Sequence, residues 1–84
     1  GVRANSIVVD GEVRDVSPSG MALMHALAAN PGEVVSREHL LRLLPVAGAD
    51  AHAVEVAIGR LRSALGAREL IVTVVKRGYR LAVD

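Results

Sequence analysis

The sequence lacks cysteine, tryptophan and phenylalanine, and Tyr79 is its only aromatic residue. Without cysteine, the chain forms neither disulfide bonds nor thiolate metal sites. Proteins that bind single-stranded nucleic acid stack bases on aromatic side chains, so a single tyrosine argues against that class. No apolar run approaches the roughly 18 residues of a membrane helix, and the first residues do not resemble a signal peptide. We therefore expect a cytoplasmic protein.

The composition favours one compact domain with an uneven charge distribution. Of the 84 residues, 51% are hydrophobic and 23% are charged, which is enough for one core and argues against disorder. Residues 1–50 hold four arginines and six acidic residues, whereas residues 51–84 hold six basic and three acidic residues. The basic second half of the chain favours an anionic partner.

Three segments have the pattern of helices, and each begins with a capping residue. Ser17, Ser36 and Asp50 are the predicted N-caps, and Gly66 is the stop signal of the last helix. The predicted helices span 18–29, 37–44 and 51–65. In the first helix we expect an apolar face made of Met21, Met24, Leu27 and Ala28.

Two pairs of β-branched runs flank these helices. Strands are predicted at 6–10 and 12–16 around an Asp-Gly turn, and at 70–75 and 79–83 around Lys76-Arg77-Gly78. A brief extended piece at Val34-Val35 precedes the second helix. This order predicts an α+β fold, a winged helix-turn-helix with three helices, a short N-terminal antiparallel β pair and a C-terminal β-hairpin wing.

The helix predicted at 51–65 is the candidate functional element. At 100° per residue its core face and its outward face separate. The core face consists of Val54, Ile58, Leu61 and Leu65, and the opposite face of His52, Val56, Gly59, Arg60 and Ser63. We expect Arg60 and Arg62 to point away from the core. A valine between arginines suits a helix that reads DNA, because valine contacts a thymine methyl and arginine binds guanine or phosphate. A packing helix with an incidental polar side is the alternative.

Four separated segments also resemble one known family. The segment from Val54 to Gly66 is similar to the recognition helix of OmpR/PhoB-type response-regulator DNA-binding domains, and the segment from Thr73 to Leu81 is similar to their wing. Residues 30–40 and Ser17-Pro18 match the family in the corresponding places. The resemblance covers nearly the whole chain from Ile7 onward. It implies the output domain of a two-component transcription regulator that binds double-stranded DNA.

The resemblance also implies roles for individual residues. Arg60 corresponds to a base-reading arginine, Val56 to a contact with a thymine methyl, and His52 and Ala53 to the start of the helix in the groove. Arg62, Thr73 and Tyr79 correspond to phosphate contacts, and Lys76 and Arg77 to the wing tip. For partners, the resemblance implies a homodimer on tandem half-sites and a contact of loop 45–49 with RNA polymerase.

Departures from the family keep an alternative function open. Val75 replaces a wing arginine, and Ala57, Gly59 and Ser63 replace longer polar or basic residues. The alternative is a winged-helix module that serves protein interaction or regulation of an attached domain, with weak or no DNA binding. We do not expect an enzyme, a metal site or a cofactor, because the sequence has no phosphate-binding glycine loop, no nucleophile motif and no cluster of metal ligands.

Overall fold

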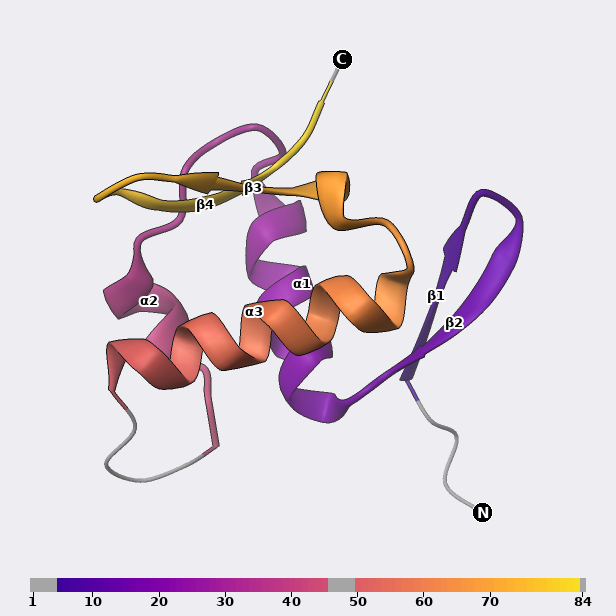
Figure 1. Ribbon diagram of the computed structural model, residues 1–84, viewed down its shortest axis with the longest axis horizontal. Helices are drawn as coiled ribbons and strands as arrows, with labels where there is room; N and C mark the ends of the chain where they lie inside the picture. The colour runs from indigo at the N-terminus through magenta and orange to yellow at the C-terminus, as the bar shows by residue number, and fades with distance from the viewer. Residues whose placement is uncertain (1–4, 46–49, 84) are drawn as a thin grey trace.

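The computed structural model describes residues 5–45 and 50–83 of the chain, and it contains three helices between two antiparallel strand pairs (Figure 1). The elements in chain order are β1 (Asn5–Val9), β2 (Glu12–Val16), α1 (Pro18–Ala29), α2 (Arg37–Arg42), α3 (Ala51–Leu65), the 3-10 helix η1 (Arg68–Leu70), β3 (Ile71–Val74) and β4 (Gly78–Leu81). This α+β arrangement confirms the predicted fold class. In the described part of the chain, no helix is long and apolar enough to span a membrane.

The helix starts agree with the predicted caps. The side chains of Ser17, Ser36 and Asp50 each accept a hydrogen bond from a backbone N–H three residues further on. The first and third helices have the predicted bounds, but α2 ends at Arg42 instead of residue 44. Leu44 precedes Pro45, and a residue before proline is disfavoured in helical conformation, so the helix stops early.

The strands differ from their predicted bounds by one or two residues. β1 covers 5–9 instead of 6–10, β2 agrees, and the wing strands cover 71–74 and 78–81 instead of 70–75 and 79–83. Residues 68–70 form η1, which the sequence pattern did not indicate. The turn between the wing strands consists of residues 75–77, with the Arg77 N–H donating to the Val74 carbonyl at 2.9 Å. The predicted turn residue Gly78 is therefore the first residue of β4.

Gly78 lies where the backbone of the wing meets the segment before α2. Its φ of +147° is one that side-chain-bearing residues rarely adopt, and a Cβ at this position would collide with the Val35 carbonyl. Beside it, Val35 and Tyr79 exchange two backbone hydrogen bonds, at 2.7 and 3.0 Å. The short extended piece at Val34-Val35 thus pairs with β4 and attaches the start of α2 to the wing.

The core confirms the predicted face of α3 and corrects that of α1. The buried apolar residues are Val16, Leu23, Leu27, Leu40, Val54, Ile58, Leu61, Leu65, Ile71 and Tyr79. In α1, Leu23 takes the central position, Met21 and Met24 are half-buried, and Ala28 is exposed. The sequence of α1 is apolar around most of its circumference, so its period alone does not select one face.

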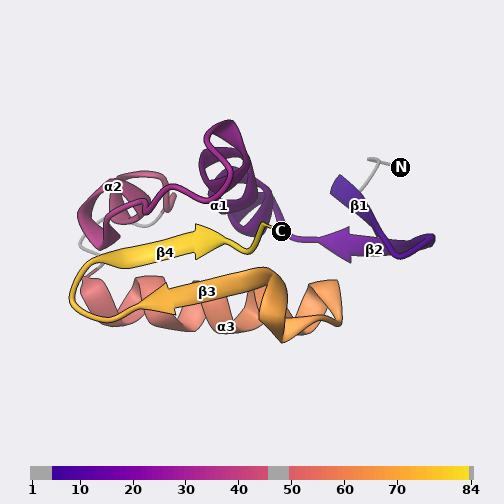
Figure 2. The ribbon, with the colours of Figure 1, turned by 90° about the horizontal axis from the view of Figure 1, so that it is seen from above.

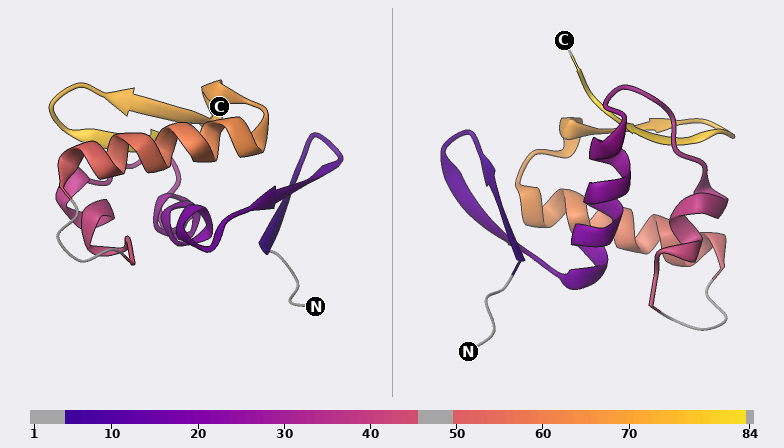
Figure 3. Two further views of the ribbon diagram at one scale, coloured as in Figure 1. Left: turned by 60° about the horizontal axis from the view of Figure 1, so that its bottom comes forward. Right: turned by 180° about the vertical axis from the view of Figure 1, so that it is seen from behind.

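The N-terminal hairpin lies at the end of α3 that is remote from the wing tip (Figures 1 and 3). Arg14 of β2 donates to the Glu12 carboxylate at 2.7 Å, and its guanidinium lies against Gly66, the left-handed C-cap of α3. A cation is favourable beside the last carbonyls of a helix. The N-terminal hairpin of β1 and β2 therefore covers the C-terminal end of α3 and does not extend over the N-terminal half of this helix.

Candidate nucleic-acid interface

The outward face of α3 carries the residues that the sequence assigned to DNA reading. His52 and Arg60 are exposed, Val56 is 37% exposed, and Ala53 is half-buried beside them. The His52 Nδ1 lies 3.7 Å from a carboxylate oxygen of Glu55. Among the residues that the structure describes, no hydrogen bond or ion pair involves the side chain of Arg60. This face therefore presents an arginine that is free to meet a partner, next to an exposed valine.

Arg62 is placed differently from the expectation. It is half-buried, and its guanidinium donates to the Ile71 carbonyl from Nε at 3.2 Å and from Nη2 at 2.7 Å. Nη2 also donates to the Thr73 hydroxyl at 2.9 Å. The expectation that Arg62 points freely away from the core is wrong, because position 62 lies on the flank of α3 that faces β3. Arg62 joins the helix to the wing.

Tyr79 belongs to the core, since only 4% of its surface is exposed. Its place in β4 is opposite Thr73 of β3, whose side chain is exposed. The phosphate contact that the resemblance implies for Tyr79 stays a prediction. Its ring lies in the core under the guanidinium of Arg62, 5.9 Å from Cζ to the ring centroid. This distance is typical of a cation–π contact.

The wing tip carries the two predicted cations, Lys76 and Arg77, and both are exposed. Val75 beside them is 75% exposed. The hairpin runs along α3, and its tip lies at the end of the molecule where α3 begins (Figures 1 and 2). The predicted residues thus fall into three groups: the outward face of α3, the cluster of Arg62, Thr73 and Tyr79, and the wing tip.

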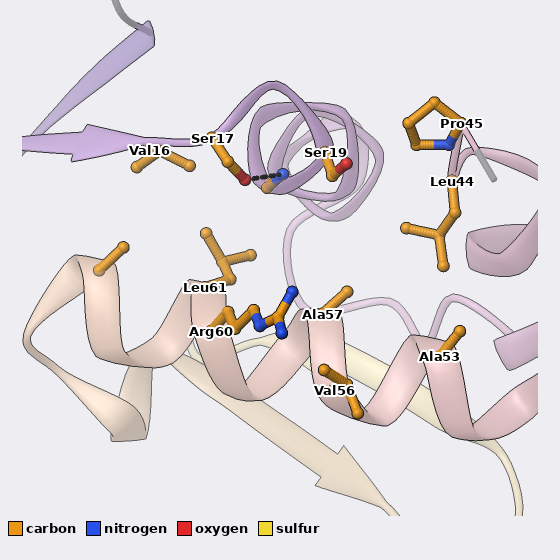
Figure 4. Close-up of a pocket in the computed structure, with 12 residues that line it drawn as sticks. Val16, Ser17, Ser19, Leu44, Pro45, Ala53, Val56, Ala57, Arg60 and Leu61 are labelled. Carbon is orange, nitrogen blue, oxygen red and sulfur yellow. Dashed lines mark hydrogen bonds between the residues drawn. The ribbon is translucent and has the colours of Figure 1, made fainter.

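A groove lies on the other flank of α3, between this helix, the N-terminal end of α1 and the segment after α2. It encloses about 500 Å³. Its lining residues are Val16, Ser17, Ser19, Gly20, Leu44, Pro45, Ala53, Val56, Ala57, Arg60, Leu61 and Ala64. In Figure 4 the guanidinium of Arg60 lies beside Ala57, on the side of α3 that faces α1. Arg60 is the one charged residue of this described lining, so the predicted base-reading arginine also borders a largely apolar hollow.

The sequence analysis did not identify Arg37 as a candidate site residue. Arg37, the first residue of α2, is half-buried, and its guanidinium lies over the Tyr79 ring at 5.7 Å from Cζ to the centroid. The sequence offers no signal for this contact, because it depends on the pairing of Val35 with Tyr79 across 44 residues of chain. The predicted RNA polymerase contact in loop 45–49 lies outside the described residues except for Pro45.

The three-helix core, the paired hairpin and the exposed face of α3 define a winged helix-turn-helix domain. The family model described as "Transcriptional regulatory protein, C terminal" matches residues 11–81, and the chain belongs to this family.

Individual relatives agree with this family. The TorCAD operon transcriptional regulatory protein TorR of Escherichia coli K12 is 40% identical over 86 residues, which cover 99% of this chain and 37% of TorR. The chain thus spans little more than a third of that relative. Among solved structures, the DNA-binding domain of E. coli CadC has a TM-score of 0.82 at 31% identity, with 96% of this chain and 81% of that chain covered. The Klebsiella pneumoniae RstA DNA-binding domain in complex with the RstA box has a TM-score of 0.75 at 31% identity, with 92% and 82% covered.

Proposed function

We propose that this domain binds double-stranded DNA with sequence specificity, as the output domain of a bacterial transcription regulator. The observation that carries the proposal is the exposed face of α3. Hydrogen bonds from Arg62 to Ile71 and Thr73 fix this helix to the wing beside that face. Helix and hairpin therefore form one surface. The RstA domain, which shares this fold at 31% identity, was solved in complex with the RstA box, which supports the same class of partner.

In the proposed complex α3 enters the major groove. Arg60 donates to a guanine edge, and Val56 lies against a thymine methyl, the two pairings that their side chains allow. His52 and Ala53 occupy the start of the helix, where recognition helices contact bases. The contacts from Arg62 and Thr73 go to the phosphate backbone, which fixes the register of the helix without reading sequence.

The wing extends the interface beyond the helix. Lys76 and Arg77 bind phosphate or enter the minor groove, where the negative potential is enhanced in narrow A-tracts. With Val75 in place of a third cation, we expect the wing to contribute less affinity than a wing with an arginine at that position. A homodimer on tandem half-sites, a contact with RNA polymerase and a place in the cytoplasm belong to the same proposal.

Selection of binding sites from random duplexes tests the proposal. The wild-type chain should enrich a defined sequence, and titration should give a tighter Kd for the selected duplex than for a scrambled one. Arg60→Ala should lose about 1–3 kcal/mol of discrimination at one base step. The matched control is Arg68→Ala, a substitution at an exposed arginine of η1 that removes the same charge from a position outside α3. Unchanged affinity and sequence preference in Arg60→Ala would refute the assignment of the reading helix.

The alternative is a winged helix that binds another protein, and the exposed valine at the wing tip favours it. Non-specific duplex binding has a Kd of about 10⁻⁴ to 10⁻⁶ M at physiological salt and tightens at lower salt. A chain that binds no duplex at tens of micromolar in low salt would therefore support this alternative.

A further inference from the structure

The groove beside α3 is open because small residues line it on two helices. Ala53, Ala57 and Ala64 follow one another on α3 at steps of four and seven residues, so they lie along one flank of the helix. Gly20 lines the groove from α1. Its volume of about 500 Å³ falls within the range of small-molecule sites, roughly 300–1,000 Å³. The groove is therefore large enough to hold a small organic ligand.

The lining of the groove is apolar except for one charge and two hydroxyl groups. Among the twelve described lining residues Arg60 is the charged one, and none is acidic. Its guanidinium lies on the side of α3 that faces α1 (Figure 4), and the first turn of α1 has no acidic residue. The Ser17 hydroxyl already accepts the capping hydrogen bond from the Gly20 N–H at 3.0 Å. This charge distribution complements a ligand that has one anionic group and an apolar body.

Both parts of such a ligand are needed for binding. A guanidinium binds a carboxylate through two parallel hydrogen bonds. Arg60 has no hydrogen bond or ion pair among the described residues, so it gives up no internal acceptor when it binds one. An exposed ion pair alone contributes little, because water and salt screen it. An apolar body in the groove adds the burial of alanine and leucine surface.

We propose that this groove binds a small amphipathic carboxylate, with the carboxylate group on Arg60 and the apolar body between α3 and the N-terminal end of α1. While Arg60 holds the carboxylate, it does not donate to a guanine edge. The ligand therefore competes with sequence reading. The binding site is independent of the proposed function, whereas the competition with DNA rests on it.

Octanoate is the probe, and NMR of the 84-residue chain is the first measurement. The backbone amide signals of Ala53, Ala57 and Ala64 should shift to saturation as octanoate is added, and those of Lys76 and Arg77 in the wing should not. The expected Kd is roughly 1 mM or tighter, as for a good ligand of about ten non-hydrogen atoms. Octanol lacks the charge and acetate lacks the apolar body, so each should bind at least about tenfold more weakly.

Two substitutions separate the shape of the groove from its charge. Ala57→Leu fills the groove and retains Arg60, so it should abolish the saturable shifts. Arg60→Gln retains the shape and removes the charge, so octanoate should bind about tenfold more weakly, with an affinity close to that of octanol. Ala28→Leu is the matched control, because Ala28 is an exposed alanine of α1 outside the groove lining. It should bind octanoate as the wild-type chain does.

Several results would overturn the binding site. They are the absence of saturable shifts at about 10 mM octanoate, tenfold above the expected Kd, equal affinities for octanoate and octanol, and unchanged binding by Ala57→Leu. Shifts of the same alanine signals with protein concentration alone would show that a second copy of the chain occupies the groove, and would also overturn it. Thermal unfolding shows whether each variant is folded, and Arg60→Gln, at an exposed position, carries the test if Ala57→Leu is not.

Titration of the selected duplex tests the competition. By mass action, octanoate at ten times its own Kd should weaken duplex binding by the wild-type chain about tenfold. Acetate at the same concentration controls for salt, and the effect of octanoate should be absent in Ala57→Leu. If octanoate saturates the groove but leaves duplex affinity as it is in acetate, the competition is wrong and the proposed function stands. If the wild-type chain binds no duplex, the proposed function fails, and the NMR titration alone decides on the groove.

Discussion

The two flanks of α3 present arginines in opposite states, although the residues are only two positions apart. On the wing flank, three donor–acceptor contacts of 2.7–3.2 Å fix Arg62 to β3, and the Tyr79 ring lies beneath it. On the groove flank, Arg60 is exposed and borders a hollow lined by Ala53, Ala57 and Ala64. At 100° per residue, two positions along the helix place these side chains on opposite flanks of α3. Only the flank of Arg62 faces β3, the strand that binds its guanidinium.

This difference matches the two tasks of a DNA-binding helix. Phosphates occupy similar positions in every duplex, so a cation held in advance loses little entropy when it binds one. Base edges differ from step to step, and an arginine without internal partners can adjust to them. The same pair of residue types can therefore serve backbone contact and base reading, depending on what lies beside each position. The comparison can be broken or sharpened by substitutions on each flank.

The largest effect is expected where the wing flank is anchored. Gly78→Ala should lower the free energy of unfolding by about 3 kcal/mol, because the backbone conformation is strained for alanine and the new Cβ meets the Val35 carbonyl. Urea denaturation measures the loss. Val35 pairs with Tyr79, and the guanidinium groups of Arg37 and Arg62 both lie over the Tyr79 ring. A disturbance of this pairing should therefore weaken duplex binding as well.

Gly11→Ala is the matched control for this prediction. Gly11 also has a positive φ, of +83°, but a Cβ there has no described neighbour within 4 Å. It should cost only the backbone strain, about 1 kcal/mol. Equal losses in the two variants would show that the close approach of Gly78 to Val35 contributes nothing to stability.

A smaller effect distinguishes the two arginines directly. Arg62→Ala should destabilise the fold by about 1 kcal/mol, because the Ile71 carbonyl and the Thr73 hydroxyl lose a charged donor. Arg60→Ala should change stability by less than about 0.5 kcal/mol, as is usual at exposed sites. Both variants remove one charge from the same helix and add the same residue, so helix propensity and net charge are matched. Equal urea midpoints would contradict the distinction between the flanks.

The sequence predicted what depends on local chemistry and repeating pattern. Caps at Ser17, Ser36 and Asp50 are visible because each needs only one side chain and the backbone just after it. The core face of α3 is visible because Val54, Ile58, Leu61 and Leu65 recur with a helical period and polar residues fill the other side. These features are sufficient for the fold class and for the helix on which the candidate site lies.

The remaining features arise from contacts between segments far apart in the chain. Arg62 binds β3, and Arg37 lies over Tyr79, through pairings that no period in the sequence records. The burial of Tyr79 follows from the position of β4 between α1 and the start of α2, so a residue that resembles a surface contact becomes a core residue. The groove likewise exists only because the end of α1 and Pro45 approach the alanines of α3.

The smallest predicted effect concerns the centre of the outward face, between the two flanks. A Cβ on Gly59 would have no neighbour within 4 Å outside its own helix among the described residues, and the backbone there is helical. Nothing in the described fold requires glycine at this position, and glycine costs a helix roughly 0.5–1 kcal/mol relative to alanine. Gly59→Ala should therefore raise the urea midpoint by a corresponding amount.

Duplex titration of Gly59→Ala then reports on the surface itself. If the backbone of α3 approaches the bases at Gly59, the added methyl group occupies space that the duplex needs, and the affinity for the selected duplex should fall while stability rises. Opposite changes in the two quantities exclude a folding explanation for the lost affinity. A stabilised variant with undiminished affinity would show instead that the duplex does not approach α3 closely at this position, and that reading is confined to the side of the helix that carries Arg60.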